Sequence, residues 1–79
     1  MPNITVEYFA ILRELAGRQT EDLSTEAGTA SVLYAELADR YGFPEAGRMK
    51  VAINEEFDDW NAVLKDGDSI VFIPPVAGG

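Results

Sequence analysis

The chain has 79 residues, of which 47% are apolar, and its 14 acidic and 6 basic residues give a net charge of -8. A chain of this length has room for one domain with a modest core, and its apolar content is typical of a globular protein. It contains neither cysteine nor histidine, which excludes disulfides, thiolate nucleophiles and the usual zinc sites. We therefore expect no self-contained side-chain active site.

The distribution of charge and hydropathy narrows the possible partners. The basic residues are scattered along the sequence and form no stripe, so nucleic-acid binding is disfavoured. An acidic surface suits a basic protein partner, although the charge could equally serve solubility alone. No apolar run approaches the roughly 20 residues that cross a bilayer, and the N-terminus lacks a signal-peptide pattern; we expect a cytoplasmic protein with no membrane association. The six cations are Arg13, Arg18, Arg40, Arg48, Lys50 and Lys65.

The first third of the chain predicts a strand, a short helix and a second strand. Polar and apolar residues alternate over Ile4–Phe9, as in a half-buried strand. The spacing of the apolar residues then changes over Ala10–Ala16, which favours a helix ending at Gly17. Residues Gln19–Leu23 form a weaker strand pattern, which we expect to pair back on the first strand.

The main helix is predicted between Thr29, a plausible N-cap, and Gly42, a plausible left-handed terminator. Its apolar residues recur at three- and four-residue steps and form one stripe. We expect that stripe to pack on a sheet. Its members are Ala30, Leu33, Tyr34, Leu37, Ala38 and Tyr41.

Two further strands are predicted, over Lys50–Ile53 and Ser69–Ile73, the second after an Asp66–Gly67 turn. Four carboxylates crowd the stretch between them, but they lack the alternating ligands and central glycine of a calcium loop. We expect a solvated loop there and no metal site. The four residues are Glu55, Glu56, Asp58 and Asp59.

This order of elements predicts a two-layer α+β domain in which one main helix covers one face of a mixed sheet. The last strand is apolar on both faces, with Phe72 and Ile70 on one side and Val71 and Ile73 on the other. One of these pairs should therefore be partly exposed, together with Phe9, and mark a binding surface. The sequence does not decide which pair faces outward. The alternative is that Phe57 and Trp60 fold over that face.

The end of the chain carries the most specific signal. Pro74 and Pro75 come directly after a core strand, and two small apolar residues separate them from the terminal Gly78 and Gly79. The prolines stiffen the base of a tail, and the glycines could thread a channel too narrow for larger residues. A free carboxylate is an unreactive anion at neutral pH, so another enzyme must activate it, most simply with ATP as an acyl-adenylate. A sulfur nucleophile would then give a thiocarboxylate, and an amine would give a protein conjugate. The alternative is a frayed tail with no role.

Two segments resemble a known family of proteins. Phe9–Gly17, FAILRELAG, resembles the FAxxRExxG opening of the molybdopterin synthase small subunit family of sulfur carriers. Leu64–Gly79 is similar to the closing segment of that family, including its PPVxGG end. The resemblance implies a ubiquitin-like β-grasp fold, here a domain over residues 1–73 with an extended tail over residues 74–79.

The resemblance also implies a function. An ATP-dependent adenylating enzyme would activate Gly79, and a sulfur-donating persulfide protein would convert it to a thiocarboxylate. The tail would then enter the large subunit of the synthase, in a heterotetramer, and supply sulfur to cyclic pyranopterin monophosphate to make molybdopterin. No cofactor would be held stably. Carried over by position, Gly79 bears the sulfur and Gly78 is the slim neck; the other expected partner-binding residues are Pro74, Pro75 and Val76 in the tail and Phe9, Arg13 and Phe72 on the docking surface.

Two alternatives of other classes remain open from the sequence. One is a ubiquitin-like modifier joined to lysines of other proteins through Gly79. The other is a sulfur carrier of another pathway, such as thiamine synthesis; those carriers share the Gly-Gly end but typically lack the Pro-Pro pair and the FAxxRE segment.

Overall fold

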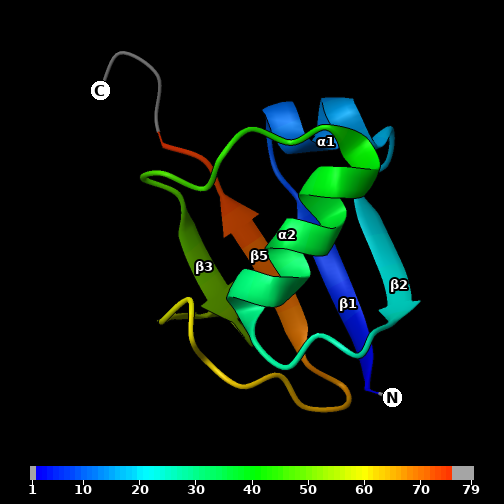
Figure 1. Ribbon diagram of the computed structural model, residues 1–79, viewed down its shortest axis with the longest axis vertical. Coiled ribbons are helices and arrows are strands. Elements are labelled where there is room, and N and C mark those ends of the chain that lie inside the picture. Colours follow the sequence, from blue (N-terminus) through cyan, green and yellow to red (C-terminus); the bar gives the residue numbers. More distant parts are fainter. Residues whose placement is uncertain (1, 76–79) are drawn as a thin grey trace.

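A five-stranded mixed sheet with one long helix across one face makes up the part of the chain that the computed structural model describes, residues 2–75 (Figure 1). The sheet order is β2-β1-β5-β3-β4, and the two central strands, β1 and β5, are parallel, whereas the other neighbours are antiparallel. This confirms the two-layer α+β arrangement. The strands are β1 (Asn3–Tyr8), β2 (Thr20–Ser24), β3 (Lys50–Ile53), β4 (Glu56–Asp58) and β5 (Ser69–Ile73).

The short helix α1 (Ile11–Ala16) connects β1 to β2 at one end of the sheet (Figure 1). It begins one residue later than predicted because Ala10 has a φ of 51°, outside the helical region. It ends at Gly17, whose φ of 74° is the left-handed conformation that glycine adopts without strain and whose N–H donates to the carbonyl of Arg13.

The main helix α2 (Ala30–Tyr41) has the predicted bounds. The Thr29 hydroxyl accepts a hydrogen bond from the Val32 N–H, and Gly42 closes the helix with a φ of 77°. Two further N–H groups of the first turn, those of Ala30 and Ser31, donate to backbone carbonyls of the segment that precedes β5. The N-terminus of α2 is therefore closed by the chain itself.

The solvated loop predicted over residues 55–59 is wrong in one respect, because Glu56–Asp58 form the edge strand β4. Asn54 and Glu55 have φ values of 53° and 72°. Positive φ at two consecutive positions is what a tight two-residue hairpin requires. All three residues of β4 are exposed, so the expected solvation of this stretch holds.

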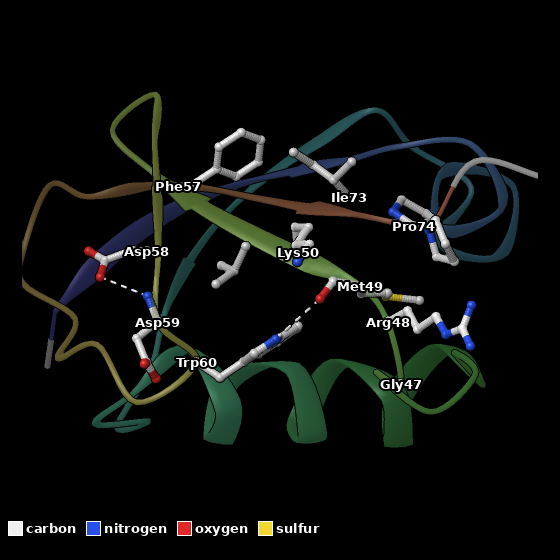
Figure 2. Close-up of a pocket in the computed structure, with 12 residues that line it drawn as sticks. Gly47, Arg48, Met49, Lys50, Phe57, Asp58, Asp59, Trp60, Ile73 and Pro74 are labelled. Carbon is white, nitrogen blue, oxygen red and sulfur yellow. Dashed lines mark hydrogen bonds between the residues drawn. The ribbon is translucent and has the colours of Figure 1, made fainter. Parts of the chain in front are cut away.

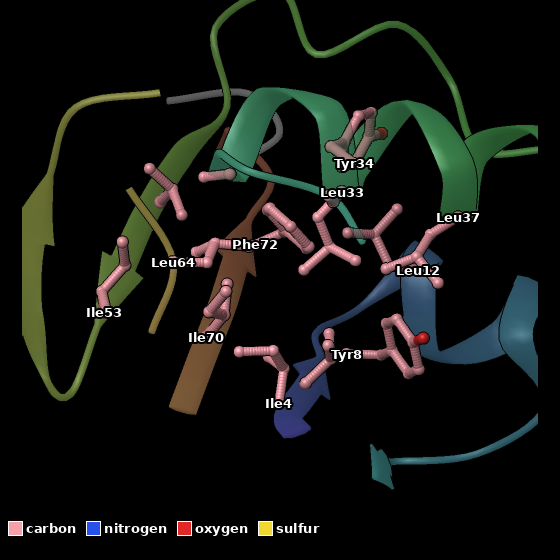
Figure 3. Close-up of a cluster of buried hydrophobic side chains, with 14 of the residues drawn as sticks. Ile4, Tyr8, Leu12, Leu33, Tyr34, Leu37, Ile53, Leu64, Ile70 and Phe72 are labelled. Atoms are coloured by element: carbon pink, nitrogen blue, oxygen red, sulfur yellow. The ribbon is translucent and has the colours of Figure 1, made fainter. Parts of the chain in front are cut away.

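The core lies between the inner face of the sheet and α2 (Figure 3). Tyr8 and Phe72 are the largest fully buried side chains. They are partners in the parallel β1–β5 register, so both point toward the helix. The Phe72 ring packs against Tyr34, with centroids 5.1 Å apart, and stacks on Trp60 at 5.7 Å.

These contacts correct one expectation and exclude part of the alternative to it. Phe72 has no exposed surface and is therefore not available to the predicted docking surface. Trp60 covers the inner side of β5 rather than the outer face, since it stacks on Phe72. Among residues 2–75, no helix has the length and apolar character needed to cross a membrane.

Candidate functional site

The outer face of the sheet carries an apolar patch next to the point where the tail begins. Figure 2 shows Phe57 and Ile73 pointing away from α2, whereas Trp60 lies on the helix side of β3. Ala52 stands between Val71 and Phe57 in the strand register. Phe57 is 75% exposed, and Val71 and Ile73 are half-buried. The outward pair of β5 is thus Val71 with Ile73, which the sequence left open.

A second group of exposed apolar side chains lies on α1 and just before it. Phe9, Ile11 and Leu15 are 49%, 44% and 41% exposed, and Arg13 of the same helix is also exposed. Phe9 follows Tyr8, the last β1 residue in the register with β5. Helix α1 therefore lies at the end of the sheet from which the chain leaves β5 (Figure 1).

The structure thus brings four of the predicted partner-binding residues to one end of the molecule. Pro74 and Pro75 directly follow β5 and line an open depression beside Arg48. Phe9 and Arg13 lie at the same end of the sheet. Phe72 is excluded by its burial. The other predicted site residues, Val76, Gly78 and Gly79, lie outside the described residues, and their roles stay predictions.

A cluster of polar side chains around the carboxylate of Glu21 joins β2 to the end of α2, and no sequence pattern predicts it. The side chain of Glu21 accepts hydrogen bonds from the hydroxyls of Tyr8 and Tyr41, both at 2.7 Å. The guanidinium groups of Arg18 and Arg40 lie 3.6 Å and 3.5 Å from it. Burial alone would raise the pKa of Glu21, but these hydrogen bonds and cations together outweigh it and hold the pKa below its ordinary value of 4.5.

We expect Glu21→Gln to destabilise the domain at neutral pH by about 1 to 3 kcal/mol, because it removes a charged hydrogen-bond acceptor from two tyrosines. A carboxyl whose pKa is lowered by folding stabilises the fold above its unfolded pKa and loses that effect as the pH falls through the folded value. Urea unfolding should therefore show the largest difference from the unmodified chain at pH 7 and a smaller one below about pH 4. The exposed Glu26 provides a control substitution, Glu26→Gln, with little expected effect. A pH-independent effect of Glu21→Gln would contradict this role of the charge.

No metal site is found among the described residues. Within residues 2–75, no three or more histidine, cysteine, aspartate or glutamate side chains gather closely enough to hold an ion.

Comparison with known proteins decides the family. The sequence profile of the ThiS family matches residues 6–79. The chain belongs to the ThiS family. The match includes the Gly78–Gly79 end, which the structure does not describe.

Curated members resemble the chain over nearly its whole length. The molybdopterin synthase sulfur carrier subunit of Escherichia coli K12 is 34% identical, with 96% of this chain and 99% of the relative covered. The protein of the same name from Haemophilus influenzae is 36% identical, with the same coverage.

Solved structures that are similar to the chain confirm the β-grasp fold. A putative molybdopterin converting factor subunit 1 from Pyrococcus furiosus has a TM-score of 0.79 at 29% identity, covering 96% of this chain and 100% of its own. Small archaeal modifier protein 1 from Methanosarcina acetivorans also has a TM-score of 0.79, at 27% identity and coverages of 100% and 98%. Subunit 1 of the molybdopterin-converting factor from Helicobacter pylori, solved in complex with subunit 2, has a TM-score of 0.67 at 30% identity and coverages of 98% and 99%.

Proposed function

We propose that this chain is the sulfur-donor subunit of a molybdopterin synthase and carries the sulfur as a thiocarboxylate on Gly79. The observation that carries the proposal is the family match over residues 6–79, which reaches the terminal Gly-Gly pair. The curated relatives named molybdopterin synthase sulfur carrier subunit support the choice of pathway.

Loading of the tail needs two other proteins. In the first step, an adenylating enzyme joins the Gly79 carboxylate to the α-phosphate of ATP and releases pyrophosphate. A persulfide sulfur of a donor protein then attacks the activated carbonyl carbon and displaces AMP. Reductive cleavage of the resulting S–S bond by a thiol leaves the sulfur on the chain. No step uses a side chain of residues 2–75, in agreement with the absence of cysteine and histidine from the sequence.

Delivery of the sulfur needs a large subunit that binds the outer face and admits the tail, in the cytoplasm. The complex of subunits 1 and 2 from Helicobacter pylori supports such a partner. The half-buried pair Val71 and Ile73, with the exposed Phe9, offers an apolar docking surface at the base of the tail. In the heterotetramer, Pro74 and Pro75 direct the tail into the large subunit. Gly78 passes the narrowest point of the channel that receives the tail, so that the thiocarboxylate reaches the pterin precursor.

A second candidate function is conjugation to other proteins. It is favoured by the structural similarity to small archaeal modifier protein 1. A modifier would use the same adenylate but transfer Gly79 to a lysine amine, with loss of AMP and formation of an isopeptide bond.

Intact-mass measurement of the protein from its native cells separates these functions. For the sulfur carrier, we expect a species in which one sulfur replaces one oxygen and which is lost after alkaline hydrolysis. High-mass adducts that disappear when target lysines are substituted would instead support the modifier. The unmodified mass alone, in cells that are making molybdopterin, would contradict both.

A further inference from the structure

Asn54, the first residue of the β3–β4 turn, makes three hydrogen bonds to the start of β5. Its backbone N–H donates to the carbonyl of Ser69 at 2.8 Å, and its side-chain oxygen accepts from the Ser69 N–H at 3.0 Å. Its side-chain NH₂ group donates to the carboxylate of Asp68 at 2.9 Å. In an antiparallel ladder, every second pair of opposed residues exchanges two backbone hydrogen bonds. At Asn54 the side-chain oxygen takes the place of one backbone carbonyl.

The backbone conformation of Asn54 explains why its side chain completes the ladder. Its φ is 53°, in the left-handed region that asparagine enters more readily than most residues. This conformation begins the two-residue hairpin and departs from regular strand geometry. A glycine would fit the φ but has no amide group. An aspartate could accept from the Ser69 N–H but, when ionised, could not donate to Asp68.

Asp68, which accepts from Asn54, is itself fixed to the sheet. Its second carboxylate oxygen accepts from the Lys65 N–H at 2.8 Å. Its backbone carbonyl accepts from the N–H of Thr5 in β1 at 3.0 Å. Asn54 therefore joins the β3–β4 hairpin to a turn that is bonded to both central strands.

The hairpin that Asn54 joins to β5 carries Phe57 of the outer apolar patch. The edge strand β4 has three exposed residues, and its neighbour in the sheet is β3. Phe57 points away from α2 (Figure 2) and lies opposite Ala52, whose partner on the other side is Val71. A strand this short contributes few ladder hydrogen bonds. The place of Phe57 on the outer face thus depends on how the turn is held.

We propose that Asn54 is a positioning residue for the docking of the large synthase subunit, because it holds the hairpin so that Phe57 lies in line with Val71. The inference rests on the proposed function, which supplies the partner. Loss of the Asn54 side chain leaves the buried core between the sheet and α2 in place. It frees Phe57 to move out of the patch, so the complex with the large subunit should dissociate faster.

A double-mutant cycle tests whether Asn54 acts through Phe57. Binding of the purified large subunit is measured for the unmodified chain, Asn54→Gly, Phe57→Ala and the double variant, at a temperature where melting curves show that all four are folded. We expect Asn54→Gly to weaken binding about fivefold when Phe57 is present, and less than about twofold when it is replaced by alanine.

Asn61→Gly supplies the matched control. Asn61 is exposed and lies between Trp60 and Ala62, whose carbonyls accept from the first turn of α2 on the helix side of the sheet. This variant should bind the large subunit within about twofold of the unmodified chain.

Asn54→Asp repeats the test at full side-chain size, in case Asn54→Gly does not fold. Near pH 7 it places a second carboxylate against Asp68, and the two repel each other. As the pH falls, one proton shared by the pair restores a donor toward Asp68. Binding relative to the unmodified chain at the same pH should therefore be about fivefold weaker at about pH 7 and recover toward about pH 5.

The other outcomes each have a defined meaning. An equal loss from Asn54→Gly in the two Phe57 backgrounds would overturn the inference, since Asn54 would then act elsewhere. Binding of Asn54→Gly as tight as that of Asn61→Gly would also overturn it, as would a loss with Asn54→Asp that does not change with pH. If Phe57→Ala binds like the unmodified chain, Phe57 is not in the interface and the inference fails. Failure of the unmodified chain to bind the large subunit would instead overturn the proposed function.

Discussion

A chain extended by one residue after Gly79 is expected to fold normally and to accept no sulfur. Activation requires the free carboxylate of a terminal glycine, and an added residue moves that carboxylate onto a different, bulkier unit. A core of tightly buried side chains lies within residues 2–75, so the melting temperature should be nearly unchanged. Intact mass after incubation with the adenylating enzyme, ATP and a persulfide donor measures the loading.

A second variant and a binding measurement separate loss of sulfur loading from loss of binding to the large subunit. Deletion of Gly79 should block loading in the same way, because it shortens the tail by one residue. Both variants should still bind the large subunit through the outer face, with weaker affinity since the tail contributes part of the contact. Full sulfur loading of the extended chain would show that loading does not require the carboxylate to stand on Gly79.

Phe72→Asp is expected to unfold the domain, whereas Val71→Asp at the adjacent position should leave it folded. Phe72 is fully buried against Tyr34 and Trp60. An unpaired carboxylate there costs several kcal/mol, which threatens a total stability of about 5 to 15 kcal/mol. Val71 is half-buried on the outer face, and a charge there should cost the fold about 1 kcal/mol. Melting curves of the two variants measure the difference.

The same Val71→Asp variant tests the docking surface. A carboxylate in the desolvated centre of an interface should weaken binding to the large subunit by about 2 kcal/mol or more. Val32→Asp supplies the matched control, because Val32 is 48% exposed on α2, on the opposite side of the molecule from that surface. If Val71→Asp binds as tightly as Val32→Asp, the outer face is not the docking surface and recognition rests on the tail.

Most of the fold could be predicted from local patterns. The alternation over β1, the capped apolar stripe of α2 and the turn before β5 each carry their own signal, and each lies within about one residue of its predicted place. The short strand β4 is not predicted because it has only three residues and all of them are exposed. Its turn uses Asn54–Glu55 rather than the usual Asn-Gly pair.

Which face of β5 points outward could not be predicted, because Ile70–Ile73 are apolar on both faces. Only the register with β1 settles it, since Tyr8 lies beside Phe72 and both point inward. The same limit explains why Phe72 was assigned to the docking surface.

The positions of the charged residues also required the three-dimensional structure. Arg13 and Lys50 are far apart in the sequence but lie at one end of the sheet. Arg13 follows the end of β1, Lys50 begins β3, and β1 is parallel to β5 whereas β3 is antiparallel to it. Glu21 shows no sequence signal for its two tyrosine partners, which come from β1 and from the last residue of α2. The proposed roles of Gly78 and Gly79, in contrast, rest on the sequence alone.

A single-turnover reconstitution tests most directly whether this chain donates sulfur to molybdopterin. Thiocarboxylated chain, purified large subunit and cyclic pyranopterin monophosphate are mixed without ATP or a persulfide donor, and the pterin product and the intact mass of the chain are followed together. We predict that molybdopterin forms while the chain returns to its carboxylate mass, and that each sulfur lost from Gly79 appears in the product. Binding of the large subunit with no pterin product, or loss of sulfur by hydrolysis alone, would contradict this function.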